Sequence, residues 1–230
     1  MKDVNPYSSP NTPLIEENRN PPKKYLNPWF SMWLQPRATI QQIIDDDPVH
    51  LVIGLTCMAS VLMRIKEASL YKMAEYMGLM SLLGVCIVVG CVLGVIWLYI
   101  GAPFIQWVGK WFGGRGSQDE IRAAIAWSCI PALWGSLLIM LEMMLYGREM
   151  FLGAEARDYN LVDLKIRAAF SVAHGIIGIW GAITFTKALA QVQGYSIWKA
   201  MGNMTIVLIA GFIPVIAVGY YLGPIGSQFN

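Results

Sequence analysis

Charged residues are scarce in this chain of 230 residues: Asp, Glu, Lys and Arg together make up only 14% of it. Soluble globular domains contain about 25% charged and about 45–50% apolar residues, whereas 56% of this chain is hydrophobic. These values argue against a soluble enzyme. The net charge of +2 is too small to indicate nucleic-acid binding, so we expect no nucleic-acid partner.

Residues that usually carry out catalysis or bind metals are also few. The chain has two histidines and four cysteines, and the cysteines show neither a CxxC pair nor a histidine at ligand spacing. This pattern predicts neither a disulfide framework nor a zinc site. Ser128 has no GxSxG context and no evident base. We therefore expect no enzymatic activity, no catalytic residue and no cofactor.

Long uncharged stretches are what the chain has instead. A helix needs about 20 apolar residues to cross the hydrocarbon layer of a membrane, and no alternating pattern typical of barrel strands is present. The predicted fold is an all-α integral membrane protein, a bundle of five transmembrane helices over residues 48–222, with a short extracytoplasmic tail at 223–230. The five candidate stretches are Pro48–Met63, Tyr76–Gly109, Ala123–Leu141, Ala168–Thr186 and Ala200–Asn230.

Prolines and glycines within these stretches predict local features of the helices. We expect kinks at Pro103, Pro131 and Pro214, with Gln106–Phe112 forming a separate interfacial segment after Pro103. Small residues at helical spacing allow neighbouring membrane helices to approach closely, which predicts close packing at two groups of glycines. These are Gly90 with Gly94, and Gly175 with Gly178 and Gly181.

The distribution of Lys and Arg predicts the orientation. Ten of these residues fall in the N-terminal segment and the second and fourth loops, against seven on the opposite side. Cytoplasmic loops carry the excess of positive charge. The N-terminus is therefore predicted to be cytoplasmic and the C-terminus to lie outside.

The N-terminal region divides into two parts. Residues 1–28 contain six of the twelve prolines, which predicts a disordered, Pro-rich cytoplasmic tail that is either a solvated leader or a segment that binds a protein partner. Residues 29–47 carry Ile40, Ile43 and Ile44 on one face and Gln41 and Gln42 on the other. This pattern indicates an interfacial amphipathic helix on the cytoplasmic surface.

Three consecutive acids end this segment, at Asp45, Asp46 and Asp47. Negative charge at a helix C-terminus opposes the helix dipole, and a divalent cation or a basic partner would offset that repulsion. The alternative is a solvated acidic end before Pro48, because three adjacent acids on a helix do not point in one direction.

The second loop is rich in glycine. Gly113, Gly114, Arg115, Gly116 and Ser117 could form a pocket of backbone N–H groups for an anion such as a lipid headgroup phosphate. The spacing is not that of a P-loop. The alternative is a plain turn followed by a helix whose N-cap is Ser117, with a glutamate three residues later completing a capping box.

Three ionisable residues fall within or at the ends of the predicted spans. Arg64, Glu142 and His174 are expected at similar depth in the outer half of the membrane. Ionisable residues there are costly and usually mark pairs or pathways, so we expect Glu142 to lie near Arg64 or His174. This cluster is either a functional site or a structural ion pair.

Five short motifs occur in an order that resembles the bacterial branch of the Yip-domain family. They are Asn27-Pro28-Trp29-Phe30, Pro36–Ile40, Phe112–Ser117, Ala126–Pro131 and Gly194–Ala200. The resemblance implies five membrane helices with a cytoplasmic N-terminus, in a bacterial inner membrane. Eukaryotic members are associated with Rab-type GTPases, but the Asp-Leu-Tyr-Gly-Pro motif usual in that branch is absent here, so the resemblance does not extend GTPase binding to this chain.

Together these features predict a non-enzymatic multi-pass membrane protein that organises membrane partners or lipids. The alternative is a small oligomeric transporter, channel or lipid-translocating protein that uses the outer-side polar cluster. The expected partners are membrane lipids, a protein at the N-terminal region and a second copy of the chain.

Overall fold

The computed structural model describes residues 25–152 and 161–226, and within these ranges every regular element is a helix. A short η1 (Met73–Glu75) and η2 (Gly147–Phe151) lie in the loops. The α-helices are α1 (Pro28–Leu34), α2 (Pro36–Asp46), α3 (Val52–Leu70), α4 (Leu79–Trp111), α5 (Gln118–Trp127), α6 (Ile130–Tyr146), α7 (Leu161–Gln193) and α8 (Ile197–Gly226).

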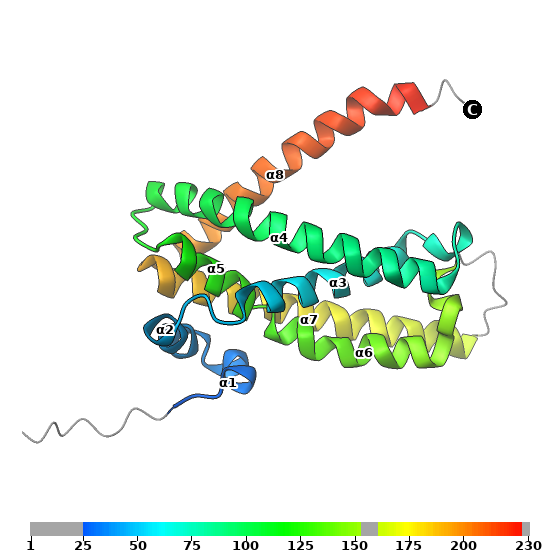
Figure 1. The fold of residues 1–230 in the computed structure, drawn as a ribbon, viewed down its shortest axis with the longest axis horizontal. Coiled ribbons are helices and arrows are strands. Elements are labelled where there is room, and N and C mark those ends of the chain that lie inside the picture. The colour runs from blue at the N-terminus through cyan, green and yellow to red at the C-terminus, as the bar shows by residue number, and fades with distance from the viewer. Residues whose placement is uncertain (1–24, 153–160, 227–230) are drawn as a thin grey trace, which may run out of the picture.

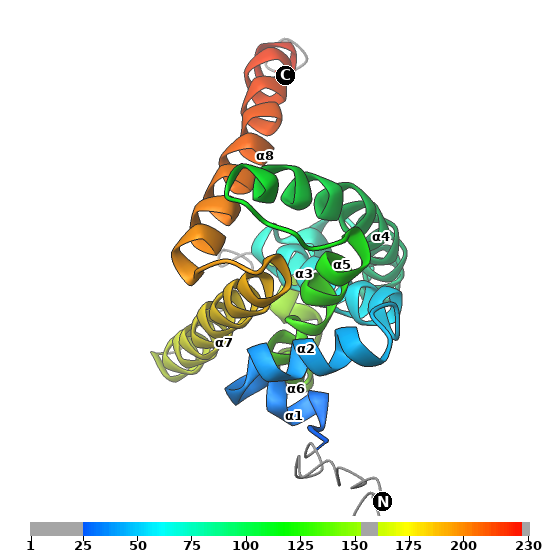
Figure 2. The ribbon, with the colours of Figure 1, turned by 90° about the vertical axis from the view of Figure 1, so that its left-hand side faces the viewer.

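Four of the helices, α3, α4, α6 and α7, lie side by side and form a bundle (Figure 1). Successive helices run in opposite directions, so that the α4–α5 loop and the α7–α8 turn lie at one end of the bundle. The helices α1 and α2 pack at this same end, while η1 and η2 lie at the other. The first part of α8 contacts α4 and α7, and the helix then leaves the bundle, as the end-on view in Figure 2 also shows.

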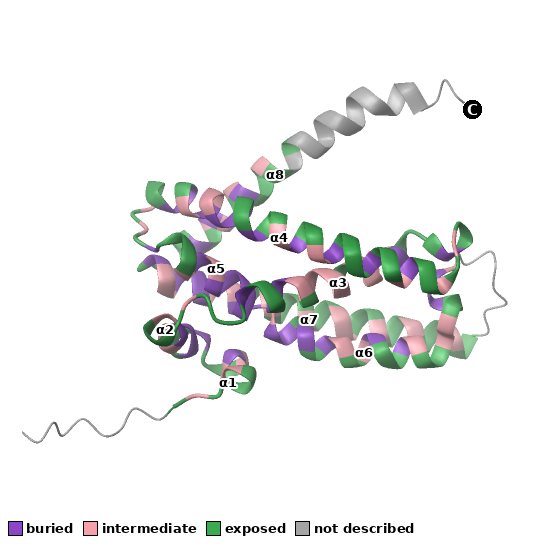
Figure 3. Cartoon of the chain, in the orientation of Figure 1, coloured by how far each residue is buried: buried purple, intermediate pink, exposed green. Residues whose placement is uncertain are grey.

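Three helical segments of the described chain are long and apolar enough to cross a membrane: α4, the α5–α6 segment Gln118–Phe151, and α7. A shorter apolar stretch follows at Ile197–Gly211 in α8. The outer face of α4 exposes large apolar side chains such as Ile87, Val88 and Ile100, and Figure 3 shows exposed residues along its whole outer side. Contiguous exposed apolar surface of this kind is typical of a face covered by lipid. The chain is thus an all-helical membrane protein.

The closest helix contact is between α3 and α4, and two glycines of α4 make it possible. A Cβ atom on Gly90 would lie 2.7 Å from Val61 Cα, and one on Gly94 would lie 2.7 Å from Ser60 Oγ. The predicted close packing at these two positions is therefore present. Gly175, Gly178 and Gly181 of α7 behave differently, because a Cβ added there would have no atom within 4 Å. The prediction of close packing at this second group was therefore wrong for the contacts within a single chain.

The prolines affect the helices less uniformly than the sequence suggested. α4 continues through Pro103 to Trp111, so Gln106–Phe112 is not a separate interfacial segment. Ala102, Ile105 and Val108 are buried against neighbouring helices, and this packing holds the helix together where proline removes one hydrogen bond.

Pro131 lies in the first turn of a new helix instead of kinking a continuous one. α5 ends at Trp127 and α6 begins at Ile130, and proline is tolerated at this position because the missing N–H would be unpaired there anyway. Ser128 does not replace the hydrogen bond that Pro131 removes, because its hydroxyl donates to the Ile125 carbonyl at 2.9 Å. Its hydroxyl instead helps to end α5.

The amphipathic segment predicted at residues 29–47 is two helices, α1 and α2, which meet at Gln35 and Pro36. The residue before a proline disfavours helical geometry, which explains the break. Met32, Ile40 and Ile43 are buried in the bundle's core. The apolar faces of the two helices are therefore covered by α5, α6 and α7.

Indole and amide groups reinforce this docking. Trp134 of α6 donates its Nε1–H to the Trp29 carbonyl, and Trp180 of α7 donates to the Trp33 carbonyl, both at 3.1 Å. The Gln191 amide donates to Gln41 Oε1 at 3.0 Å. We call α1 and α2 together the N-terminal helix pair.

Two predictions on the ends of the chain are only partly covered. The Pro-rich tail at 1–28 lies outside the described residues up to position 24, and α1 already begins at Pro28. The tail predicted at 223–230 is helical up to Gly226, and its last four residues lie outside the described part. The backbone of α8 is helical through Pro214, whose side chain is also outside it.

We expect Gly90→Ala to destabilise the protein by about 1–3 kcal/mol, because the new methyl group overlaps the backbone of α3. Gly84→Ala is the matched control, since it lies on the same helix with no atom within 4 Å of the added Cβ. Its helix propensity should leave stability unchanged or raised. Thermal unfolding in detergent, followed by circular dichroism, measures both. Equal melting temperatures for the two variants would contradict the close contact.

Candidate functional site

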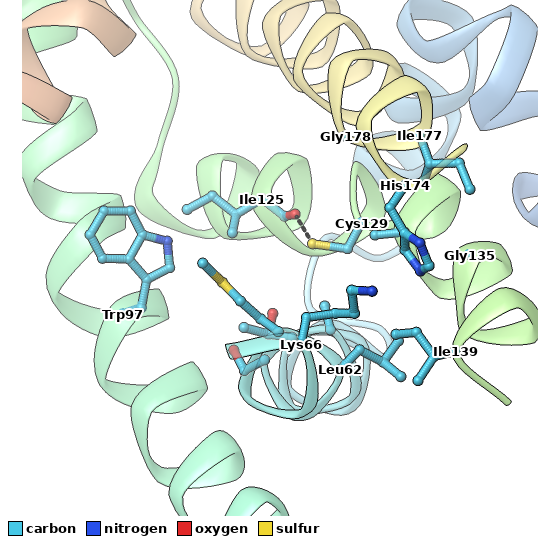
Figure 4. A pocket seen from close by; sticks show the side chains of 15 residues that line it. Leu62, Lys66, Trp97, Ile125, Cys129, Gly135, Ile139, His174, Ile177 and Gly178 are labelled. Atoms are coloured by element: carbon cyan, nitrogen blue, oxygen red, sulfur yellow. Dashed lines mark hydrogen bonds between the residues drawn. The ribbon is translucent and has the colours of Figure 1, made fainter. Parts of the chain in front are cut away.

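An apolar cavity of about 440 Å³ lies between α3, α4, α6 and α7. Most of its lining is aliphatic or aromatic, and Figure 4 shows Trp97 of α4 at one side and His174 of α7 at the other. Lys66 and His174 supply its basic groups, and the thiol of Cys129 also lines it. Pockets for small ligands have volumes of about 300–1,000 Å³, with mostly apolar walls and a few polar groups. This interhelical cavity fits that description.

Glycines and a neighbouring cavity make the space accessible from the side. Gly135 of α6 and Gly178 of α7 line the cavity without side chains to fill it. A second cavity of about 560 Å³ shares Ser60, Met63 and Trp97 with the first. The two cavities therefore adjoin along α3 and α4, and together they form an elongated apolar space.

A polar triad closes one end of the interhelical cavity. Lys66 Nζ donates to Glu142 Oε2 at 3.0 Å, and His174 Nε2 lies 3.9 Å from the same oxygen. Glu142 is only 8% exposed, so its charge is largely removed from water. A buried carboxylate requires a partner, and the Lys66 ammonium supplies it. We call Lys66, Glu142 and His174 the polar triad.

The structure brings together two of the three residues proposed from the sequence. Glu142 and His174 lie in the triad, but Arg64 forms an ion pair with Glu67 on its own helix. Lys66 takes the place that the sequence assigned to Arg64. Residues two apart on a helix point in directions about 200° apart, so similar depth in the membrane did not identify the partner.

The tautomer of His174 follows from its hydrogen bond. The Nδ1 atom lies 2.8 Å from the Phe170 carbonyl, which can only accept, so Nδ1 carries the hydrogen. Nε2 is buried, with no hydrogen-bond partner in the described ranges, and faces Glu142 at 3.9 Å. Protonation at Nε2 would turn this contact into a charged pair.

The glycine-rich loop does not form the anion pocket considered above. The N–H groups of Gly113, Gly114 and Arg115 donate to backbone carbonyls, and the Gly116 N–H donates to Gln193 Oε1 at 3.3 Å. These donors are therefore already used within the protein. Ser117 caps α5 and Glu120 completes the capping box, which confirms the alternative of a turn with a cap.

Close packing against α7 is the reason for two of the loop glycines. A Cβ atom on Gly114 would collide with the Gln193 amide, and one on Gly116 would lie 2.8 Å from Val192. Gly113 has a φ of +83°, a conformation that glycine adopts without strain. Sequence reasoning missed this long-range contact because nothing in the loop points to Gln193.

A buried polar cluster at the same end of the bundle was also missed. Asn203 is fully buried, and its amide donates to the Ile105 carbonyl at 3.0 Å and to the Tyr195 hydroxyl at 2.9 Å. Burial raises the pKa of the Tyr195 phenol above its ordinary value, while the Asn203 hydrogen bond acts in the opposite direction. The cluster fixes the start of α8 to α4. The only sequence signal was the amide of Asn203 in an otherwise apolar stretch of α8.

The three acids at the end of α2 do not gather around one point. Asp45 accepts from Gln41 at 2.8 Å, and Asp47 accepts from the Val49 backbone at 3.0 Å. No group of three or more His, Cys, Asp or Glu side chains in the described ranges could hold a metal ion. The triplet is thus not a metal centre by itself.

The fold and the site define a class: an all-helical membrane protein with a lateral apolar cavity and a buried ion pair. A sequence model described as the Yip1 domain matches residues 30–218. The chain therefore belongs to the Yip1 domain family, which confirms the family predicted from the five motifs. No curated protein and no solved structure matches the chain.

We expect Lys66→Met and Glu142→Gln to be coupled. Each single change removes a charge-assisted hydrogen bond in a buried place, which costs about 1–3 kcal/mol, and the double variant should recover about 1–2 kcal/mol of the summed loss. The measurement is a double-mutant cycle of unfolding free energies in detergent. Arg64→Met combined with Glu142→Gln is the control and should be additive, because Arg64 pairs elsewhere. Additivity in both cycles would refute the ion pair.

Proposed function

We propose that this protein is a non-enzymatic, multi-pass membrane protein that binds and organises membrane lipids in the interhelical cavity. The observation that carries the proposal is the combination of an elongated apolar cavity with a buried polar triad at one end. An acyl chain suits the apolar walls, and a polar lipid group suits the Lys66 and His174 end. Both groups are needed to retain an amphiphile in a single orientation.

The arrangement of the helices supports five membrane passes as part of this proposal. α3, α4, α5–α6 and α7 run alternately between the two ends of the bundle, and α8 starts at the end where α7 finishes (Figure 1). α3 has 19 residues, which corresponds to about 28 Å of helix, close to the thickness of the hydrocarbon layer. Its charged half is covered by α4 and α6. Together with the bias of Lys and Arg, this arrangement supports the proposal of a cytoplasmic N-terminus and an outside C-terminus.

A bacterial inner membrane and a scaffold role complete the proposal. The N-terminal helix pair lies at the proposed cytoplasmic end and is fixed to α6 and α7. The preceding tail could therefore present a protein partner to the bundle at a defined place. The open face of α7 at Gly175 and Gly181 is available for lipid or for a second copy of the chain.

Filling the cavity tests the proposal. Gly178→Leu should reduce crosslinking to a phosphatidylglycerol with a diazirine in its acyl chain by about tenfold, because the new side chain occupies the space of the chain. Crosslinked peptides that contain Met63 or Ile139, which line the cavity, are quantified by mass spectrometry. Gly175→Leu is the matched control, since it lies on the same helix, has open space and does not line the cavity. Equal labelling in both variants would rule out the cavity as the lipid site.

A second candidate function is translocation of lipid or of protons through the same site. It is favoured by the titratable pair of Glu142 and His174 next to a cavity between helices, since ionisable groups within membranes often mark pathways. The triad would then act as the polar step along the path.

Flux through liposomes distinguishes the two functions. Under the second function, the wild-type protein should scramble a fluorescent lipid or leak protons, and Glu142→Gln should lower the rate at least tenfold. Glu67→Gln is the control, because Glu67 lines neither of the two adjoining cavities and does not pair with the polar triad. The absence of flux from the wild-type protein, with lipid crosslinking retained, would leave binding and organisation as the function.

A further inference from the structure

A third cavity, of about 320 Å³, lies between the N-terminal helix pair and the ends of α3 and α5. Its walls include the aromatic rings of Tyr25, Trp29 and Trp127 and the carboxylates of Asp46 and Asp47. Trp29 packs edge-on to Trp127, with ring centroids 6.2 Å apart. The cavity is separate from the interhelical cavity and shares no lining residue with it.

The charge of this cavity is negative. Asp46 and Asp47 line it together with His50, and no lysine or arginine of the described chain does. Asp46 and Asp47 also close the C-terminal end of α2, where the helix dipole adds partial negative charge. Acidic residues at this end of a helix oppose the dipole, so a positive charge bound here would relieve the repulsion. The geometry of the wall therefore favours a cation.

The aromatic rings indicate which kind of cation. Ammonium groups, including the primary ammonium of lysine, are attracted to the faces of Trp and Tyr rings, and cages of such rings recognise quaternary ammonium groups. A hydrated divalent cation would instead need several oxygen ligands, and Asp47 already uses its carboxylate to accept from Val49. An organic ammonium group matches both the rings and the acids.

The floor of the cavity offers a further observation. Trp127 is only 3% exposed, and its indole Nε1 is buried with no hydrogen-bond partner among the residues described. A buried donor without an acceptor costs free energy. Since this atom has almost no accessible surface, a ligand oxygen next to the ammonium group would supply the missing acceptor only after a shift of the indole toward the cavity. Phospholipid headgroups such as phosphoethanolamine carry both groups.

We propose that the cavity formed by Tyr25, Trp29, Trp127, Asp46 and Asp47 binds the ammonium group of a zwitterionic phospholipid headgroup. The position of the cavity favours a lipid over a protein side chain as the source. The cavity lies where the apolar helix α3 begins, and its lining includes the exposed apolar side chain of Leu51, which would contact the upper part of the acyl chains. The site is independent of the interhelical cavity and does not rest on its function.

The test compares two lipids that differ only in their headgroups. The full-length chain, purified in a maltoside detergent that has no ammonium group, is titrated with dihexanoyl phosphatidylethanolamine or dihexanoyl phosphatidylglycerol, and bound lipid is counted by native mass spectrometry. We expect about fivefold tighter binding of the ethanolamine lipid. Because the chains are identical, acyl-chain contacts contribute equally to both lipids, and the variants below separate the headgroup preference of this site from that of the Lys66 and His174 end of the interhelical cavity.

Two neighbouring acids provide the variant and its control. Asp46→Asn should lower the ethanolamine preference to nearly one, because Asp46 lines the cavity and is exposed, so its replacement leaves the fold intact. Asp45→Asn removes the same charge one residue away, outside the lining, and should keep the preference. Trp29→Leu should also abolish the preference, whereas a purely electrostatic surface effect would not respond to it.

Several results would overturn the assignment. Equal binding of the two lipids, or equal losses in Asp45→Asn and Asp46→Asn, would exclude a headgroup site. Competition by free phosphoethanolamine at the same concentration as the lipid would assign a soluble amine. Displacement by Mg²⁺ that does not depend on Trp29 would assign a metal ion, and tighter binding of a lysine-rich peptide would assign a protein partner.

Discussion

The charged half of α3 is the constraint on which the bundle depends. Arg64, Lys66 and Glu67 lie within one turn of a helix whose other residues are uncharged, and hydrocarbon does not tolerate such charges unless they are paired or covered. The fold meets this need in two ways. Arg64 and Glu67 pair with each other, and Lys66 reaches across to Glu142 of α6. α4 then approaches α3 closely at Gly90 and Gly94 and covers its remaining side.

The same constraint explains where the cavity lies. Lys66 has to cross the space between α3 and α6 to reach Glu142, so the helices cannot collapse onto each other at that level. Gly135 and Gly178 leave the facing walls without side chains. An apolar space ending in a buried ion pair is the result. The polar triad is therefore part of the architecture of the bundle.

The sequence was most informative about features that depend on nearby residues. The capping box at Ser117 and the close contact at Gly90 and Gly94 could be predicted because each is encoded within a few positions, as was the family. Features that depend on distant partners could not. Depth in a membrane follows from distance along the chain, but direction around the helix decides between Arg64 and Lys66.

The same limit applies to the loops and the N-terminal region. Three glycines in the second loop are compatible with an anion pocket or with close packing, and only the position of Gln193, nearly 80 residues later, decides between them. The pattern of Ile40 and Ile43 correctly indicated an apolar helix face. Whether bilayer or protein covers such a face is not encoded in its periodicity, and here α5, α6 and α7 cover it.

The two indole hydrogen bonds at α1 have a mechanical consequence. Trp134 and Trp180 donate to carbonyls of α1 from two different helices, α6 and α7, and these helices form one wall of the interhelical cavity. A displacement of α1 is therefore transmitted to both helices, through residues that do not line the cavity. Such a displacement would thus change the spacing between α6 and α7, and with it the width of the cavity that they line.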